Sequence, residues 1–191
     1  MSLREDAEAG LFAGLEAAQP GERVAGWLQA NDEVARPVGR LLVVAIGKAA
    51  CPMVSGVLEK RSVDPDDILV VTKDNHGGEC PEGVVPQEAG HPRPDSRSLA
   101  AGGRILERAG VLGEKDELLL LISGGASALA DALPPEIDPE VWFAANDALV
   151  GGGLPIQAIN AVRKHCSLLK GGQLARAAAP ARGTALLLSD V

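Results

Sequence analysis

Leu41-Leu-Val-Val-Ala-Ile46 is an unbroken apolar run, and Gly47-Lys48 follows it directly, ahead of a helix-like stretch that reaches about Lys60. A strand that is apolar at every position is typical of a sheet covered on both faces, as parallel sheets are. The turn after such a strand lies at the start of a helix, where unpaired backbone amides favour an anion. This stretch therefore predicts a parallel α/β fold with a ligand site at the carboxyl end of the strand.

Further apolar runs follow this strand, with helix-like stretches between them. The later predicted strands are residues 68–72, 118–122 and 185–188, with a weaker one at 84–85, and the helical stretches are residues 96–109, 139–150 and 155–170. Strands that alternate with helices build a parallel sheet whose right-handed crossovers place helices on both faces. We therefore predict an α/β fold, a three-layer Rossmann-like sandwich in which ligands bind where strands end and helices begin.

Residues 1–36 differ from the rest of the chain, because they mix Ala, Leu and Glu at helical spacing with a break at Pro20-Gly21. This spacing predicts two helices, which we expect to pack on the Rossmann-like domain formed by residues 37–191. The segment 73–95, rich in Gly, Pro and His, is the longest irregular segment and a candidate functional loop. The Ala- and Arg-rich stretch 175–182 is the one segment of low complexity.

The composition limits the kinds of partner. The chain has 191 residues, 46% of them apolar, which is enough to bury one core. A net charge of −8, with 2% aromatic residues and no Tyr, argues against nucleic acid, which needs a large basic surface and stacking platforms. No apolar run approaches the ~20 residues that span a bilayer, so we expect no membrane partner. A homo-oligomer is compatible with this composition.

The three cysteines, Cys51, Cys80 and Cys166, are odd in number and far apart, with no Cys-x-x-Cys pair and no metal-ligand spacing. This pattern predicts reduced thiols. The N-terminus also lacks the basic and apolar regions of a signal peptide. We therefore predict a cytoplasmic protein.

Between Ala148 and Ser189 the chain has five Lys and Arg residues and no carboxylate, although the whole chain has 18 Lys and Arg against 26 Asp and Glu. On a helix over residues 159–170, the polar face carries Asn160, Arg163, Lys164, Ser167 and Lys170, and the apolar face carries Ile159, Val162, Cys166 and Leu169. Charge runs are often solvated faces, but those usually mix signs. No residue of this polar face has an acidic partner three or four positions away, so we favour a site for a small anion.

Two strand-to-helix turns are candidate anion-binding loops. Gly47-Lys48 adds a full positive charge to a helix start, and Ser123-Gly124-Gly125-Ala126-Ser127 offers two hydroxyls and flexible backbone amides. Gly47-Lys48 is neither a Walker A loop nor a Gly-x-Gly-x-x-Gly dinucleotide motif. Each turn alone could be a solvated lysine or a tight turn with positive φ. Two such turns in one sheet favour a ligand site.

Three further side chains are candidates. His91, held between a Gly and a Pro, could donate to a ligand or act as an acid or base near neutral pH, although a lone His is more often structural. Asp95 fits the N-cap of the helix that follows it. Asp190 comes directly after the last predicted strand, where parallel α/β enzymes place a Mg²⁺-binding or catalytic carboxylate. Because the chain stops one residue later, we expect an N-terminal piece of a longer protein.

Together these segments resemble the glycerate 2-kinase family, whose members join an N-terminal Rossmann-like domain to a C-terminal MOFRL domain. The resemblance covers most of the chain. The matching segments, in the family's order, are Gly47-Lys48-Ala49-Ala50 with Met53, Val71-Thr72-Lys73 with His76, residues 89–95, residues 123–129, residues 160–165 with Ser167 and Lys170-Gly171-Gly172, and Leu188-Ser189-Asp190-Val191. One such segment would be a weak signal, but six in the same order are specific.

The resemblance implies phosphorylation of D-glycerate at its 2-hydroxyl, with ATP as phosphoryl donor and Mg²⁺ as cofactor. It implies that Lys48, Arg163 and Asp190 are catalytic and that Asp190 also binds Mg²⁺. The residues implied to bind substrate or phosphate are Gly47, His91, Ser123, Gly124, Gly125, Ser127, Asn160, Lys164, Lys170, Gly171 and Gly172. Phosphoryl transfer depends mostly on positioning and charge stabilisation, which suits a site of cations and amides.

The chain departs from the family pattern at Ala126, where a third Gly is usual, and at Ala158, where a Glu is usual. The family also continues past Ser-Asp-Val into a second domain that closes over the site, so we expect the isolated chain to be weakly active or inactive. Two other functions stay open. One is an NAD(P)H-dependent hydroxypyruvate reductase, a label that such sequences carry, although the dinucleotide motif is absent. The other is a non-catalytic sugar-phosphate-binding domain.

Overall fold

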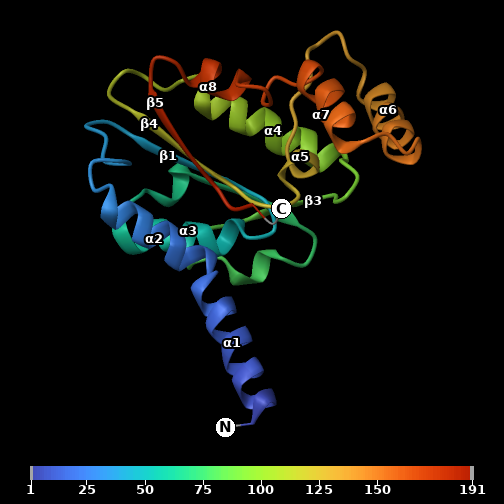
Figure 1. Ribbon diagram of the computed structural model, residues 1–191. Coiled ribbons are helices and arrows are strands. Elements are labelled where there is room, and N and C mark those ends of the chain that lie inside the picture. Colours follow the sequence, from blue (N-terminus) through green and yellow to red (C-terminus); the bar gives the residue numbers. More distant parts are fainter. Residues whose placement is uncertain (1, 190–191) are drawn as a thin grey trace.

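The computed structural model describes residues 2–189. Within that range the centre of the molecule is a parallel sheet of five strands in the order β3-β2-β1-β4-β5, with helices on both faces (Figure 1). The strands are β1 Leu41–Ile46, β2 Ile68–Lys73, β3 Gln87–Ala89, β4 Glu117–Ile122 and β5 Arg182–Leu187. The predicted three-layer α/β sandwich is confirmed.

The helices alternate with these strands. They are α1 Leu3–Ala17, α2 Pro20–Ala30, α3 Ala50–Lys60, α4 Ser96–Ala109, α5 Ala126–Leu129, α6 Pro139–Gly151, α7 Ile156–His165 and α8 Gln173–Ala178, with single 3-10 turns η1 Pro65–Asp67 and η2 Gly77–Glu79. None of the helices within residues 2–189 has the length and apolar content that a membrane span requires.

Two apolar cores lie on opposite faces of the sheet. Every residue of β1 is buried. Successive side chains of a strand point to opposite faces, and helices cover both faces of this sheet. Val43 and Ala45 join the core that α2 and α3 cover, whereas Leu42 and Val44 join the core that α4, α5 and α8 cover. This two-sided burial explains why the strand is apolar at every position.

The strand order reverses between β1 and β4. β1 leads into α3 on one face of the sheet, and β4 leads into α5 on the other face. The two strands pair in register, with Ile46 opposite Ile122, so the turns after them begin side by side. In open α/β sheets the crevice at such a switch point is where ligands bind. The fold therefore places the two candidate turns at one position.

The N-terminal helices behave differently from each other. The break near Pro20 is confirmed, and α2 buries Val24 and Leu28 against the sheet. In contrast, α1 buries none of its residues and projects away from the body (Figure 1). Leu11 and Phe12 on α1 are 62% and 67% exposed. We expected the whole segment 1–36 to pack on the core, and for α1 that expectation is wrong.

Three predicted elements have different bounds. The weak strand at 84–85 is wrong, because Val84 fills the core from a loop while residues 87–89 pair with β2. The helix predicted over 155–170 ends at His165, since Ser167 bends the chain by accepting hydrogen bonds from the backbone amides of residues 169 and 170. The stretch 175–182 contains most of α8 and the first residue of β5.

The prediction of free cysteines is wrong for two of the three. Cys51, in the first turn of α3, and Cys80, in the loop after β2, form a disulfide, whereas Cys166 is a free thiol. Their 29-residue separation in the sequence gives no sign of this pair. The pair forms because the loop 74–86 folds back beneath the start of α3, which brings the two Cα atoms within 4.5 Å. The cytoplasmic location, which relied partly on free thiols, stays a prediction.

Candidate functional site

The two turns at the switch point are hydrogen-bonded to each other. The backbone amide of Lys48 donates to the carbonyl of Gly124 at 3.0 Å, and the amide of Ala49 donates to Ser123 Oγ at 3.0 Å. The amide of Ser123 in turn donates to the carbonyl of Ile46. These bonds fix the backbone of both turns relative to each other. The exposed side chain of Lys48 therefore extends from a rigid support.

Gly47 makes the close approach of the turns feasible. Its φ of +133° lies in a region that side chains disfavour, and a Cβ on it would collide with the hydroxyl and the backbone of Ser123. We expect Gly47→Ala to lower the free energy of unfolding by about 3 kcal/mol, from backbone strain and overpacking. Thermal and urea unfolding measure this loss.

Gly103 on α4 provides the control, since its added Cβ would meet no atom within 4 Å. We expect Gly103→Ala to raise stability by roughly 0.5 kcal/mol, because Gly disfavours a helix interior. A Gly47→Ala variant as stable as Gly103→Ala would contradict the proposed close packing of the turns.

His91 lies against the serine-glycine turn. Gly125 has φ +92°, and a Cβ there would lie 2.9 Å from His91 Cδ2. The loop that carries His91 is anchored by Asp95, whose carboxylate accepts from the backbone amides of Arg97 and Ser98 at 3.0 and 3.2 Å. Asp95 is therefore the N-cap of α4, as its position in the sequence predicted. The cap holds His91 close to the switch point.

Burial lowers the pKa of His91 from its ordinary 6.5, and the nearby charges of Lys48 and Lys73 lower it further. Lys48 lies just after β1 and Lys73 is the last residue of β2, so positive charge is concentrated at the carboxyl edge of the sheet. A neutral imidazole in this field can accept a proton or a hydrogen bond near pH 7.

We expect NMR titration to give His91 a pKa below 6.5, and Lys48→Met to shift it upward. Since folding favours neutral His91, its contribution to stability is present above pH 6.5 and is lost as the pH falls through the folded-state pKa. Lys115→Met, at the opposite edge of the sheet, is the control and should leave the pKa of His91 unchanged. A pKa at or above 6.5 in the parent protein would contradict this electrostatic coupling.

A second group of polar residues surrounds the buried carboxylate of Asp131. Lys170 Nζ lies 2.8 Å from Asp131 Oδ2, and Ser167 Oγ donates to Asp131 Oδ1 at 2.5 Å. Burial lowers the pKa of Lys170, and the charge of Asp131 opposes that shift. The stretch 148–189, which has no carboxylate of its own, thus forms an ion pair with a carboxylate from another segment, Asp131. At its far end, Arg182 also pairs with an outside carboxylate, that of Glu117.

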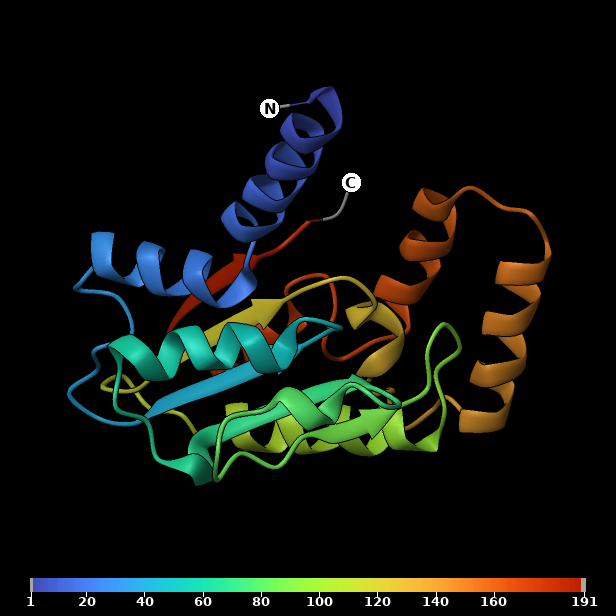
Figure 2. The ribbon, with the colours of Figure 1, turned by 90° about the horizontal axis from the view of Figure 1, so that it is seen from below.

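Arg163 is buried rather than exposed to solvent. Its Nε donates to Asn146 Oδ1 at 2.8 Å, which ties α7 to α6. The buried residues of α7 are Ile159 and Arg163, while Val162 is 41% exposed. The predicted division into apolar and polar faces is therefore wrong at Val162 and at Arg163. Figure 2 shows α6 and α7 side by side next to the carboxyl end of the sheet.

The other residues of the predicted basic face have separate places. Lys164 is exposed, and its side chain lies against Gly171, where an added Cβ would be 3.6 Å from Lys164 Cβ. Asn160 is exposed on α7, and Gly172 opens α8 with φ +88°. Lys164 and Asn160 are therefore free to meet a ligand, whereas Arg163 and Lys170 are held by protein partners.

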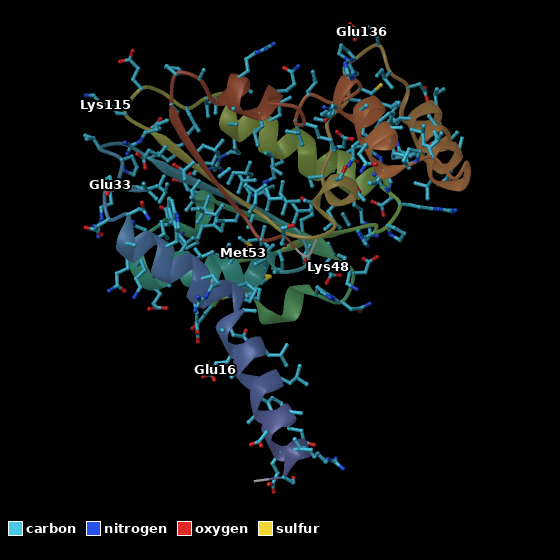
Figure 3. The ribbon with its side chains drawn as sticks, in the orientation of Figure 1. Glu16, Glu33, Lys48, Met53, Lys115 and Glu136 are labelled. Atoms are coloured by element: carbon cyan, nitrogen blue, oxygen red, sulfur yellow. A yellow bond between two sulfur atoms is a disulfide. The ribbon has the colours of Figure 1, made fainter. Side chains whose placement is uncertain are left out.

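The short helix α5 connects the two groups. The serine-glycine turn precedes it, and Ala130 and Asp131 follow it. Lys170 Nζ donates to the carbonyl of Ala130 at 3.2 Å, and Ser127 and Lys170 line a shared hollow. Lys48 lies at the carboxyl end of the sheet, just after the end of β1 (Figure 3). Most of the predicted site residues thus gather around one short helix.

A larger hollow, about 440 Å³, lies at the opposite edge of the sheet. Each of its cations pairs with a carboxylate: Arg36 at 2.7 Å, Arg40 at 3.5 Å, Lys60 at 2.6 Å and Arg61 at 3.5 Å. It also lies at the amino ends of β1 and β2, where parallel sheets do not bind ligands. We therefore place the candidate site at the switch point despite the larger volume elsewhere.

Sequence reasoning missed Asp131 and Asn146. Asp131 did carry a signal, since it interrupts the apolar run Ala128–Leu133, and a carboxylate among apolar residues is buried only when it is paired. Asp190, predicted to be catalytic and to bind Mg²⁺, lies outside the described residues. Among residues 2–189, no three His, Cys, Asp or Glu side chains come together as metal ligands.

A doubly wound parallel sheet with two hydrogen-bonded, glycine-containing turns at its switch point defines a Rossmann-like α/β protein. The family model described as "Domain of unknown function (DUF4147)" matches residues 6–191, and the chain belongs to that family. Its relatives include glycerate kinases, which confirms the predicted membership of the glycerate 2-kinase family.

A D-glycerate 2-kinase of Thermotoga maritima is 38% identical over 152 residues, which are 80% of this chain and 36% of that protein. A protein of Agrobacterium vitis, named as a candidate hydroxypyruvate reductase, is 39% identical over 163 residues, or 84% of this chain and 36% of that protein. The crystal structure of a protein from Pyrococcus horikoshii OT3 matches 100% of this chain with TM-score 0.82 and 33% identity. The chain covers 44% of that structure and so spans less than half of each of these relatives.

Proposed function

We propose that this chain is the N-terminal, Rossmann-like part of a glycerate 2-kinase that transfers the γ-phosphoryl group of ATP to the 2-hydroxyl of D-glycerate. The observation that carries this proposal is the exposed Lys48 on two hydrogen-bonded turns at the switch point. The kinase names of the relatives support it. In this proposal a second, MOFRL-type domain closes the site, so the chain alone is weakly active or inactive.

The geometry suggests a role for each group. Lys48 would stabilise the negative charge on the transferred phosphoryl group, because its support holds it at the carboxyl edge. The backbone amides of Gly124 and Gly125 and the exposed hydroxyl of Ser127 would contribute donors to one anion, and Lys164 with Asn160 would contribute to another. Arg163 bonds Asn146, so we assign it to holding α7 in place rather than to the reacting atoms.

Mg²⁺ in such a site commonly takes one or two carboxylates and completes its shell with phosphate oxygens and water. We propose Asp190 as the protein carboxylate. When bound, Mg²⁺ would neutralise charge that builds up on the phosphates during transfer. Asp131 is a poor candidate, since both of its oxygens already accept hydrogen bonds from Ser167 and Lys170.

An assay of the full-length gene product tests the function. We expect phosphorylation with D-glycerate and Mg²⁺-ATP, and no NADH or NADPH oxidation with hydroxypyruvate. Reduction of hydroxypyruvate without phosphorylation would favour the reductase. Phosphorylated sugars that raise the melting temperature, with neither activity present, would favour a non-catalytic binding domain.

A further inference from the structure

An apolar hollow of about 280 Å³ lies beside the switch point, on the face of the sheet that α4 and α8 cover. Ile46 and Ile122, the last residues of β1 and β4, belong to its floor, and Leu169 and Leu174 belong to its walls. Ile122 is only partly buried, because α5 has four residues and leaves the end of the sheet uncovered. Apolar surface therefore faces outward at the place where ligands bind in this class of fold.

The rim of the hollow is polar. Ser127 and Lys170 line it, and the Lys170 ammonium is fixed by Asp131 Oδ2 at 2.8 Å and the Ala130 carbonyl at 3.2 Å. The Lys170 side chain is 16% exposed, so its position is set by the protein rather than by solvent. A ligand in the hollow would therefore have an apolar part inside and a polar part at the rim.

The hollow is continuous with the two turns. Ala126 lines it and directly follows the serine-glycine turn, and Ile46 lines it and directly precedes Gly47-Lys48. Any group that extends from the hollow along the start of α5 reaches the backbone that supports Lys48. The exposed cation Lys48 thus lies at the end of a path that begins in the hollow.

We propose that this hollow holds the heterocyclic base of the nucleotide, with the phosphates directed past Ser127 toward Lys48. This inference rests on the proposed function for its use of ATP. The volume of about 280 Å³ is near the lower limit of small-molecule sites, roughly 300 Å³, and suits one flat base rather than a whole nucleotide. The exposed charge of Lys48 beside the hollow favours a phosphorylated ligand over an apolar polypeptide segment. Glycerate would then bind on the side of Lys48 that faces His91.

The test fills the hollow and compares two ligands. Ala126→Leu in the full-length gene product adds three carbons at the floor of the hollow, and calorimetry measures the Kd of ADP and of inorganic tripolyphosphate, which has no base. We expect ADP to bind at least ~10-fold more weakly, because close-packed sites tolerate extra volume poorly, and tripolyphosphate to change less than ~2-fold. Ala144→Leu, on the exposed side of α6, is the matched control and should change neither Kd.

Equal weakening of both ligands would overturn the proposal, since it would show damage to the phosphate turn rather than loss of a base site. Unchanged ADP binding would also overturn it and would indicate that polypeptide covers the hollow. Leu169→Ala, which removes a wall without adding volume, repeats the comparison if Ala126→Leu does not fold. A protein that shows the expected ADP pattern but does not phosphorylate glycerate would retain the base site and refute the proposed kinase reaction.

Discussion

Lys48→Ala in the full-length gene product is expected to lower kcat/KM for glycerate phosphorylation at least ~100-fold, because it removes a pre-positioned cation from the transition state. The loss should fall mainly on kcat, since a group that acts on the transferring phosphoryl contributes more in the transition state than in the ground state. The fold should survive, because the side chain is exposed and its backbone makes the bonds to the neighbouring turn. Steady-state kinetics with circular dichroism measures both.

Lys115→Ala is the matched control for this substitution. Lys115 is also an exposed lysine beside a strand, but it lies at the amino end of the sheet, far from Lys48 (Figure 3). We expect near-parent kinetics for Lys115→Ala. Near-parent turnover in Lys48→Ala would show that Lys48 is not catalytic. The two hydrogen-bonded turns would then have only a structural role.

Asp131→Asn is expected to lower the free energy of unfolding by about 3 kcal/mol, because it leaves the Lys170 ammonium without its buried counter-charge. Asp131 is 2% exposed and accepts from both Lys170 and Ser167. The pKa of Lys170, already lowered by burial, should fall further in this variant. Urea unfolding of each variant beside the parent protein measures the loss.

A second substitution separates the lost charge pair from general damage. Lys170→Met in the Asp131→Asn background should recover at least half of the lost stability, because no uncompensated charge then remains buried. Asp147→Asn is the control, since Asp147 pairs with Arg93 at 3.1 Å where both side chains are more than half exposed. An exposed pair is worth less than about 1 kcal/mol. If Asp131→Asn lowers the free energy of unfolding no more than Asp147→Asn does, the buried pair of Asp131 and Lys170 contributes little to stability.

The central strands β1, β2 and β4 were predictable from the sequence because they are largely buried on both faces. Burial on both faces requires apolar residues at every position, as in β1, and this local pattern is visible without any tertiary information. The strand β3 was missed because it is three residues long and only Ala89 is fully buried. The end of α7 was missed because a distant carboxylate, Asp131, holds Ser167 outside the helix.

The candidate site was predictable to a lesser degree. Local motifs indicated both turns, and the strand order then placed them side by side. The stretch 148–189 was misjudged at Lys170, where the predicted free cation has a partner 39 positions earlier in the sequence. The Cys51–Cys80 pair is another contact between distant segments that no local spacing indicated.

The sequence by itself determined the parallel α/β fold, the family and the Gly47-Lys48 and serine-glycine turns, because each depends on residues that are close together in the chain. Only the tertiary structure decided which cations are free to meet a ligand. Lys48 and Lys164 are exposed, whereas Arg163 and Lys170 are taken up by Asn146 and Asp131. The physical reason is that the charge available at a site depends on partners that folding brings together from distant segments, and a run of like charges does not record them.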